Sequence, residues 1–483
     1  MNIKAITLNV GKALLVSALF MLLSLVLSII NGFDAGFMPL LISCLLTALV
    51  GMFPFIFVKT APAMTMKDGF VTIVLAWLLS FIFGMLPYII YGGEEFTIIN
   101  AWFESVSGYT TTGSTILKDI EALPKSLLFW RSSTHFIGGL GIVVFLLLVL
   151  PQASPYRMKL TNMEMSSLSK DGYRYKSNKV LRIIVTVYLG FVVTSFFSLW
   201  AAGMSAFDAI NHAFSIAATG GFSTKNLSIA AYDSELIHYI VLFFMVICAM
   251  HFGLLYSVIV TGSLKPMNNS VVRSYFGSII LCSAITMISL MTQGGYTSWG
   301  KAALDSTFTV ASYMSTTGFA ICDNALWPWL AGMMLIVVSL HCGCSGSTTG
   351  GFKIDRLVIA YKAIGHELKR RLHPSAVSHV RMSGQNLSDD SVSAVMMFMV
   401  LYVFAIFVSI IAVMMCGSEP STAVTGVVAS IGSVGPGLGE IGCLDSYAAQ
   451  PAMAKFIYSF DMFLGRVEIY PILVVLSMIF KRR

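Results

Sequence analysis

A short phrase of threonine and glycine occurs four times along the chain, and backbone of this kind can bind a cation. The copies are Thr111-Thr112-Gly113, Thr219-Gly220-Gly221, Thr316-Thr317-Gly318 and the more divergent Gly435-Pro436-Gly437. Glycine lets the backbone turn its carbonyls toward a common axis, and threonine adds a hydroxyl oxygen. In potassium channels, rings of backbone carbonyls replace the water that a permeating ion loses. The four phrases are therefore predicted to converge into one selectivity filter, with potassium as the transported ion and no cofactor in this chain.

Each phrase follows a short apolar segment that is predicted to be a re-entrant pore helix. Three apolar turns are too short to span a membrane, and the negative end of such a helix would favour a cation at the phrase. Thirteen residues before the central glycine of the first three copies stand candidate helix N-caps, and six residues before it stands a serine. The candidate caps are Asn100, Asp208 and Asp305, and the serines are Ser107, Ser215 and Ser312.

The fourth copy has neither feature at these offsets, so its alignment depends on a count in the other direction. Glycines stand 28 residues after the central glycines of three copies, at Gly141, Gly346 and Gly465. This count makes Gly437 the fourth centre, with Gly435 as the alternative. Because the four copies differ, the filter is expected to have only pseudo-fourfold symmetry and to discriminate less sharply than four identical TVGYG loops.

The composition identifies an integral membrane protein. The chain has 483 residues, of which 57% are hydrophobic and 11% charged, and its mean hydropathy is +0.82. Soluble domains carry about 25% charged residues. Ten membrane spans fit the apolar runs, and the first, near residues 8–31, is too long for a signal peptide and is expected to be retained.

These spans predict an all-α polytopic fold with two extra helices followed by four membrane-pore-membrane repeats. The extra helices occupy residues 1–66, and the repeats occupy residues 67–158, 172–264, 270–365 and 388–483. Two basic stretches, Arg157 to Arg182 and Lys353 to Arg381, carry seven Lys or Arg each. Their alternation along the chain follows the positive-inside rule, which predicts cytoplasmic termini and explains the +7 charge without nucleic acid.

Two features on the predicted cytoplasmic side of the phrases could control passage. Arg466 is a lone cation in an apolar helix, where it costs at least ~2.5–3.5 kcal/mol. It would either repel cations beneath the filter or pair with Glu468 or a carbonyl. Residues 342–351 contain eight Gly, Ser or Thr and cannot form a stable lipid-facing helix. They predict either a loop that blocks the cavity or a kinked, closely packed helix.

At these motifs the chain resembles the TrkH branch of the Trk/Ktr/HKT superfamily of potassium transporters. The resemblance covers the whole length and is carried by Phe103-Glu104-Ser105-Val106-Ser107-Gly108-Tyr109-Thr110-Thr111-Thr112-Gly113, Gly220-Gly221-Phe222-Ser223-Thr224, Gly343-Cys344-Ser345-Gly346-Ser347-Thr348, Gly435-Pro436-Gly437-Leu438-Gly439 and Gly465-Arg466-Val467-Glu468.

This resemblance implies potassium uptake by a homodimer in the lipid of a bacterial inner membrane, together with a cytoplasmic nucleotide-binding regulator of the TrkA type. It also implies an intramembrane gate formed by Gly343, Ser345, Gly346, Ser347 and Thr348, with Arg466 as a pore arginine.

Other classes of function fit less well. A symporter that couples potassium to protons or sodium by alternating access is the alternative, although the repeats are parallel and no buried acidic pair is evident near the filter. No nucleophile–base set supports an enzyme, and the histidines lack metal-ligand spacing. Cys416 and Cys443 flank the last phrase on the predicted outer side, where either a disulfide or ordinary packing would suit them.

Overall fold

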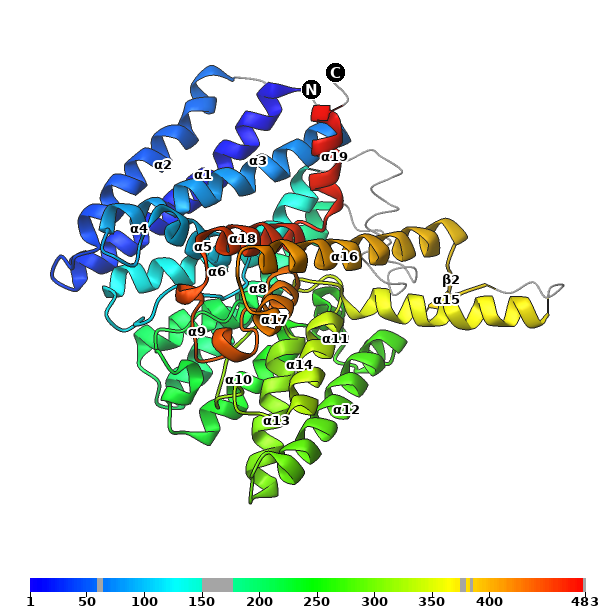
Figure 1. Ribbon diagram of the computed structural model, residues 1–483. Coiled ribbons are helices and arrows are strands. Elements are labelled where there is room, and N and C mark those ends of the chain that lie inside the picture. Colours follow the sequence, from blue (N-terminus) through cyan, green and yellow to red (C-terminus); the bar gives the residue numbers. More distant parts are fainter. Residues whose placement is uncertain (59–63, 150–176, 374–378, 383–384, 481–483) are drawn as a thin grey trace.

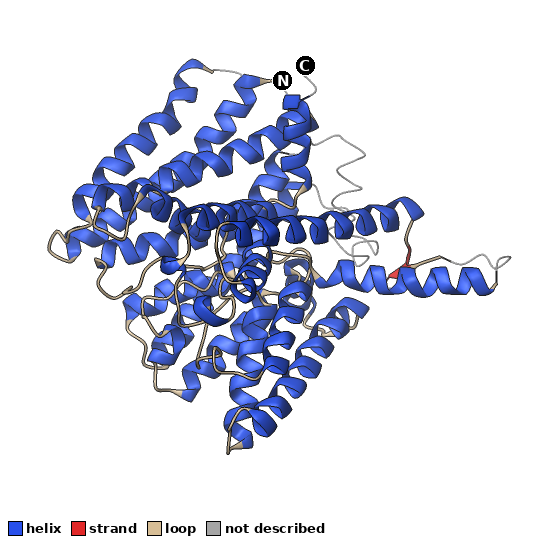
Figure 2. Ribbon diagram, in the orientation of Figure 1, coloured by secondary structure: helices blue, strands red, loops and turns tan. Residues whose placement is uncertain are grey.

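The computed structural model describes residues 1–58, 64–149, 177–373, 379–382 and 385–480. These residues are mostly helical, with loops between the helices and almost no strand (Figure 2). The one sheet among them is a two-stranded antiparallel pair of β1 (Arg381–Met382) and β2 (Gln385–Asn386). The predicted all-α fold is therefore confirmed.

Two long N-terminal helices, α1 (Ile3–Ile30) and α2 (Phe37–Phe57), pack along each other at one edge of the bundle (Figure 1). Small residues let their backbones approach closely, as in many membrane helix pairs. A Cβ atom on Gly11 would lie 2.7 Å from the carbonyl oxygen of Gly51. Asp34, in the turn between the helices, accepts hydrogen bonds from Ser28 Oγ at 2.6 Å and Ser126 Oγ at 2.7 Å, which fixes the pair to the bundle.

Each of the four following segments contains an outer helix, a short helix and then an inner helix or a broken helix pair. In chain order these are α3 (Met66–Gly84) with α4 (Leu86–Tyr91), α5 (Ile98–Tyr109) and α6 (Lys125–Val149); α8 (Ser177–Ala201), α9 (Ala206–Ala218), α10 (Glu235–Cys248) and α11 (Phe252–Thr261); α12 (Ser270–Gln293), α13 (Trp299–Met314), α14 (Trp329–His341) and α15 (Ile354–Leu372); and α16 (Asp389–Met415), α17 (Pro420–Gly432), α18 (Ala452–Arg466) and α19 (Tyr470–Phe480).

Short 3-10 turns complete the connections between these helices. They are η2 (Ser228–Ala231), η3 (Lys265–Met267), η4 (Gly439–Ile441) and η5 (Tyr447–Ala449). The order of helices agrees with the membrane-pore-membrane pattern, while the symmetry of the repeats stays a prediction.

Within the described residues, six helices are long and apolar enough to cross a membrane, or eight if each bent pair counts as one span. The two other predicted spans correspond to α6, which continues to the end of its described segment, and to α14 with α15. The pairs α10–α11 and α18–α19 bend by 103° and 107°. Three of the four inner helices are therefore interrupted, and the break between α14 and α15 was predicted from its small residues.

Candidate functional site

The four short helices α5, α9, α13 and α17 all end in the same uncommon backbone conformation. Within two residues of each helix end stands a non-glycine residue in the left-handed region, and these residues are Thr111, Thr219, Thr316 and Ser433, with φ of 55°, 53°, 55° and 53°. For β-branched residues this conformation is strained, so it persists only where the surrounding structure fixes it. Such strain is found mainly at functional sites.

A glycine follows two residues later in every copy, again with positive φ, and these glycines are Gly113, Gly221, Gly318 and Gly435. A Cβ atom on each would lie 2.0–2.5 Å from a carbonyl oxygen of the next copy. The contacts close a cycle: Gly113 to Gly220, Gly221 to Thr317, Gly318 to Val434, and Gly435 to Thr112. Residues 111–113, 219–221, 316–318 and 433–435 thus form what we term the four-phrase ring.

The ring corrects the alignment of the fourth copy. Ser433, Val434 and Gly435 occupy the equivalent positions, so the alternative centre Gly435 is right and Gly437 is wrong. Gly437 lies two residues beyond the ring, and Pro436 packs beside it, 2.8 Å from a Cβ on Gly318. The forward count failed because its glycines have different contacts. Gly465 faces the carbonyl oxygen of Ile431, whereas in the first unit the glycine that faces the matching carbonyl, that of Tyr109, is Gly138 and not Gly141.

The predicted pore-helix caps are also wrong. The residues that cap α5, α9 and α13 are Thr97, Ser205 and Ser298, whose hydroxyls accept from backbone N–H groups three residues on. Asn100 and Asp208 are the third helical residues, and Asp305 lies further inside α13 because that helix begins about one turn earlier relative to its phrase. Serine and threonine are about as common at N-caps as asparagine and aspartate. The shared offset of Asn100, Asp208 and Asp305 therefore could not distinguish them from the true caps.

A cavity of about 310 Å³ opens on one side of the four-phrase ring. All four ring glycines line it, together with loop residues that follow the phrases, including Lys118, Lys225 and Asp445. Because the phrases follow the C-terminal ends of four short helices, partial negative charge gathers at the ring. The cavity therefore gives access to a ring of backbone oxygens that suits a cation.

On the opposite side, the loop of residues 342–353 lies directly against the ring. The Thr348 hydroxyl accepts a hydrogen bond from Thr219 Oγ1 at 3.3 Å and donates one to the Ala217 carbonyl at 3.1 Å. The Gly350 N–H donates to Thr316 Oγ1 at 3.3 Å, and a Cβ on Gly350 would lie 2.5 Å from that of Ser433. Thr348, one of the predicted gate residues, and Gly350 of the same loop thus contact the second, third and fourth phrases.

The same loop is fixed to the break between α10 and α11. The Cys344 N–H donates to the Ala249 carbonyl at 2.9 Å, and the Phe252 N–H donates to the Gly346 carbonyl at 3.1 Å. The Ser347 hydroxyl bonds to Thr349 Oγ1 at 2.7 Å. The loop is therefore closely packed and hydrogen-bonded, although it is not helical.

Arg466 is fully buried and contacts this loop. Its guanidinium donates to the Thr348 carbonyl at 2.5 Å and to the Gly138 carbonyl of α6 at 3.0 Å. The alternative pairing with Glu468 is not made, because Glu468 instead forms ion pairs with Lys353 at 3.2 Å and Arg356 at 2.8 Å. Arg466 is thus bound by backbone carbonyls only among the described residues.

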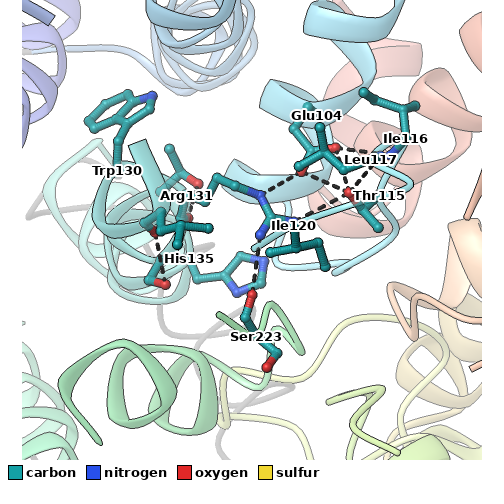
Figure 3. Close-up of polar contacts among 12 residues, drawn as sticks. Glu104, Thr115, Ile116, Leu117, Ile120, Trp130, Arg131, His135 and Ser223 are labelled. Carbon is teal, nitrogen blue, oxygen red and sulfur yellow. Dashed lines mark hydrogen bonds and ion pairs between the residues drawn. The ribbon is translucent and has the colours of Figure 1, made fainter. Parts of the chain in front are cut away.

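A second buried cation lies behind the other end of the ring. Arg131 of α6 forms an ion pair with Glu104 of α5, with 2.7 Å between Nε and Oε1, and both side chains are at most 1% exposed. Figure 3 shows the guanidinium between Glu104 and Thr115 on one side and Ser223 on the other. It donates to Thr115 Oγ1 and to the Ser223 carbonyl, each at 3.3 Å.

Aromatic rings complete this cluster. The Arg131 guanidinium lies 4.0 Å from the centre of the Phe222 ring, and the imidazole of His135 stacks on the same ring at 4.1 Å. His135 Nδ1 also forms a hydrogen bond with Ser215 Oγ at 2.9 Å. The second phrase is thus supported from behind by side chains of α6.

Tyrosine hydroxyls support the ring near the fourth phrase. Tyr313 donates to the Gly437 carbonyl at 3.0 Å and accepts from Asn324 Nδ2 at 2.9 Å. Tyr447 donates to the Gly435 carbonyl at 3.0 Å, and Ser114 Oγ donates to the same oxygen at 2.9 Å. This part of the ring is held by neutral hydrogen bonds.

Sequence reasoning missed most of these supporting residues. Arg131 had a usable signal, since a lone cation in an apolar helix requires a buried partner. Tyr313 and Tyr447 gave none, because tyrosine is ordinary in pore helices and loops. Cys416 and Cys443 are both free, so the disulfide is absent. Among the described residues, no group of three His, Cys, Asp or Glu is arranged to hold a metal ion.

The chain is similar in sequence and in fold to known proteins. The family model described as TrkH, cation transport protein, matches residues 41–482. The Trk system potassium uptake protein TrkH of Salmonella typhimurium is 34% identical over 388 residues, which is 80% of each chain, and that of Escherichia coli K12 is 33% identical over 392 residues. The crystal structure of the potassium transporter TrkH from Vibrio parahaemolyticus aligns with a TM-score of 0.88 at 29% identity and covers 99% of both chains. The chain therefore belongs to the TrkH family of cation transport proteins.

Proposed function

We propose that this protein takes up potassium across the bacterial inner membrane through the four-phrase ring, which acts as its selectivity filter. The observation that carries the proposal is the closed cycle of glycine–carbonyl contacts at the ends of four short helices. The proposed ion is potassium because the relatives are named potassium uptake proteins. The proposal treats residues 67–158, 172–264, 270–365 and 388–483 as the four repeats around the pore.

The ring residues would bind dehydrated potassium through backbone carbonyls and hydroxyls. We propose the predicted set for this role, with Ser433 and Val434 added and with Pro436 and Gly437 left outside the ring. Among the described residues, the hydroxyls of Thr111 and Ser433 have no hydrogen-bond partner, so they remain available to an ion. The hydroxyls of Thr219 and Thr316 are instead engaged by the 342–353 loop.

The 342–353 loop, with Arg466, would close the path beneath the ring. Because the loop contacts Thr219 and Thr316, it would block an ion that moves out of the ring on this face. Arg466 places a buried positive charge at the loop, which opposes a cation there. Opening would require the Arg466–Thr348 bond to break, so Arg466→Ala should raise conductance and change rectification.

Assembly and control follow from the family likeness. We expect a homodimer in membrane lipid with both termini in the cytoplasm and a TrkA-type nucleotide-binding regulator. No nucleic acid or resident cofactor is required. Arg356 and Lys353, which pair with Glu468, connect α15 to the fourth unit and would transmit a regulator's movement to the loop.

The test is potassium uptake by a cell that lacks its own uptake systems, with and without a co-expressed regulator. Restored growth at low potassium, lost in Gly221→Ala, supports the proposal. An expressed, membrane-inserted chain that restores no uptake with any regulator overturns it.

A symporter remains the second candidate, and one residue favours it. Asp461 of α18 is fully buried, receives a hydrogen bond from Ser409 Oγ at 2.6 Å, and leaves Oδ2 without a partner among the described residues. Ionisable groups inside membranes often bind protons for coupling. Reversal potentials under separate potassium, sodium and proton gradients distinguish the two. A proton-dependent shift that Asp461→Asn abolishes would favour symport.

A further inference from the structure

Arg131 contacts equivalent residues that follow two adjacent phrases. Thr115 stands two residues after Gly113, and Ser223 stands two residues after Gly221. The guanidinium donates to Thr115 Oγ1 with one terminal nitrogen and to the Ser223 carbonyl with the other. The set of hydrogen bonds from Arg131 to Glu104, Thr115 and Ser223, which we term the Arg131 bridge, therefore joins the first two phrases just beyond the ring (Figure 3).

Glu104 fixes this cation in turn. Its carboxylate accepts from Arg131 Nε at 2.7 Å, from Thr115 Oγ1 at 3.0 Å and from the Ile116 N–H at 3.1 Å. The carboxylate thus holds the first phrase directly and orients the guanidinium toward the second. Charge-assisted hydrogen bonds are shorter and stronger than neutral ones, and the planar fork of arginine fixes direction as well as distance.

The second phrase is clamped from another direction. Phe222, next to Gly221, packs between Arg131 and His135, with a separation of 4.0 Å to the guanidinium and 4.1 Å to the imidazole. A Cβ atom on Gly220 would lie 2.4 Å from His135 Nδ1, so this phrase cannot retreat from the pore axis without moving α6. Both phrases are therefore held in place by side chains of the same helix, α6.

We propose that Arg131 and Glu104 are positioning residues that set the ion selectivity of the ring, an inference that rests on the proposed function. They act by fixing the spacing of the first two phrases, whose carbonyls would bind potassium. With the spacing fixed, the ring cannot contract around the smaller sodium ion. When the bridge is cut, these two phrases adjust to either ion.

Stability alone does not explain such a pair. A buried ion pair often contributes no more to stability than apolar residues of the same volume, because desolvation offsets the attraction. In the bridge, the three nitrogens of the Arg131 guanidinium donate to acceptors on three separate segments, at Glu104, Thr115 and Ser223. An apolar side chain of the same volume cannot make these bonds. Geometry, rather than burial, is what this arginine supplies.

The test uses the full chain, purified and reconstituted in liposomes, with the potassium-to-sodium permeability ratio as the readout. Arg131→Lys keeps the charge beside Glu104 but cannot reach both Thr115 and Ser223. The double variant Glu104→Gln with Arg131→Met removes both charges and leaves neither one unpaired. Both should transport potassium with a ratio reduced by roughly tenfold, the factor that one hydrogen bond to a charged group represents.

Glu121→Gln is the matched control. Glu121 pairs with Lys225 at 3.2 Å and joins the same two loops, but that pair is exposed, so the ratio should stay at the wild-type value. The inference is overturned if Arg131→Lys and the double variant both keep a ratio within twofold of wild type. It is also overturned if neither variant folds, since the pair is then structural. A wild-type protein that moves no potassium would instead overturn the proposed function.

Discussion

Two halves of the four-phrase ring, one formed by the first and second phrases and the other by the third and fourth, are held in place by different kinds of hydrogen bond. Between the first and second phrases, a buried guanidinium and carboxylate bind the backbone. Between the third and fourth phrases, the Tyr313 hydroxyl does so, supported by Asn324. The close approaches that complete the ring are nevertheless alike in all four phrases, since a Cβ added to each ring glycine would lie 2.0–2.5 Å from a carbonyl oxygen.

This difference separates the ring from its support. The backbone conformation is repeated in all four phrases, while each unit holds its phrase with different side chains. A charged support is directional but costs desolvation, and a tyrosine hydroxyl is weaker but tolerant of change. Loss of support should therefore have unequal consequences on the two sides, and loss of a ring glycine should have equal ones.

The largest effect is expected at the ring glycines, whichever side they belong to. Gly221→Ala and Gly435→Ala each place a Cβ within 2.5 Å of a carbonyl oxygen at positive φ, 85° and 101°. The left-handed conformation alone costs about 1–2 kcal/mol for a residue with a Cβ. Potassium uptake in a deficient cell should fall to background in both variants.

Gly437→Ala is the control for this prediction. Its Cβ would meet side-chain atoms and no backbone: Ile441 Cδ1 at 2.6 Å, Ile441 Cγ1 at 2.8 Å and Thr425 Oγ1 at 3.1 Å, and side chains can shift more easily than a carbonyl of the ring. Uptake should persist. The alignment of the fourth phrase at Gly435 fails if Gly437→Ala abolishes uptake and Gly435→Ala does not.

The next largest effect is expected on the charged side. Glu104→Ala leaves Arg131 buried without its carboxylate, and breaking one partner of a buried pair costs about 3–5 kcal/mol. The thermal unfolding midpoint of the detergent-solubilised protein should fall strongly. Glu121→Ala, which breaks the exposed pair with Lys225, should cost at most about 1 kcal/mol. Equal midpoints for the two variants would contradict a buried, stabilising role for Glu104.

Much of the fold could be predicted from the sequence, because its signals are local. Long apolar runs identify spanning helices, and small residues such as those of 342–351 identify a break. The first three phrases could be singled out in the sequence, and the structure gives each of them a threonine and a glycine in the left-handed conformation, which few residues tolerate. These constraints act within a few residues.

What the sequence could not predict depends on contacts between units. The fourth phrase was misaligned because Ser433 and Val434 stand where the other phrases have Thr or Gly. The equivalence appears only in the backbone conformation of Ser433 and in the approach of this phrase to Gly318 and Thr112. Glu104 could be noticed, but its partner lies 27 residues away on another helix. The pairing of Glu468 with Arg356 crosses 112 residues. Contacts between residues so far apart in the sequence produce no local periodicity, so a sequence pattern cannot predict them.

On the tyrosine side, a smaller effect is expected. Tyr313→Phe removes the hydroxyl that donates to the Gly437 carbonyl and leaves the Asn324 amide without its acceptor. A neutral hydrogen bond contributes about 1 kcal/mol, so the unfolding midpoint should fall slightly and uptake should continue. A loss as large as that of Glu104→Ala would show that the two sides are equally dependent on their supports.

The smallest effect is expected at an exposed contact between the first two units. The Asn226 amide donates to Asp119 Oδ1 at 2.9 Å and holds the pKa of that carboxyl below its usual 3.8. Because the pKa is lowered in the folded state, the contribution is complete above pH 3.8 and is lost as the pH falls through the folded value. Asn226→Ala should therefore lower the unfolding midpoint by a larger, though still small, amount at pH 7 than well below pH 3.8. The Ile120 N–H, which donates to Asn226 Oδ1 at 2.6 Å, loses its acceptor at either pH.

Asp119→Asn is the matched control, because it removes the titrating group and with it the pH dependence of this contact. Since Asp119 is exposed, solvent screening keeps the effect small. If Asn226→Ala instead destabilised the protein as much as Glu104→Ala, surface contacts would join the first two units as firmly as the buried pair. The Arg131 bridge would then be one support among several, and its predicted control of selectivity would lose its physical basis.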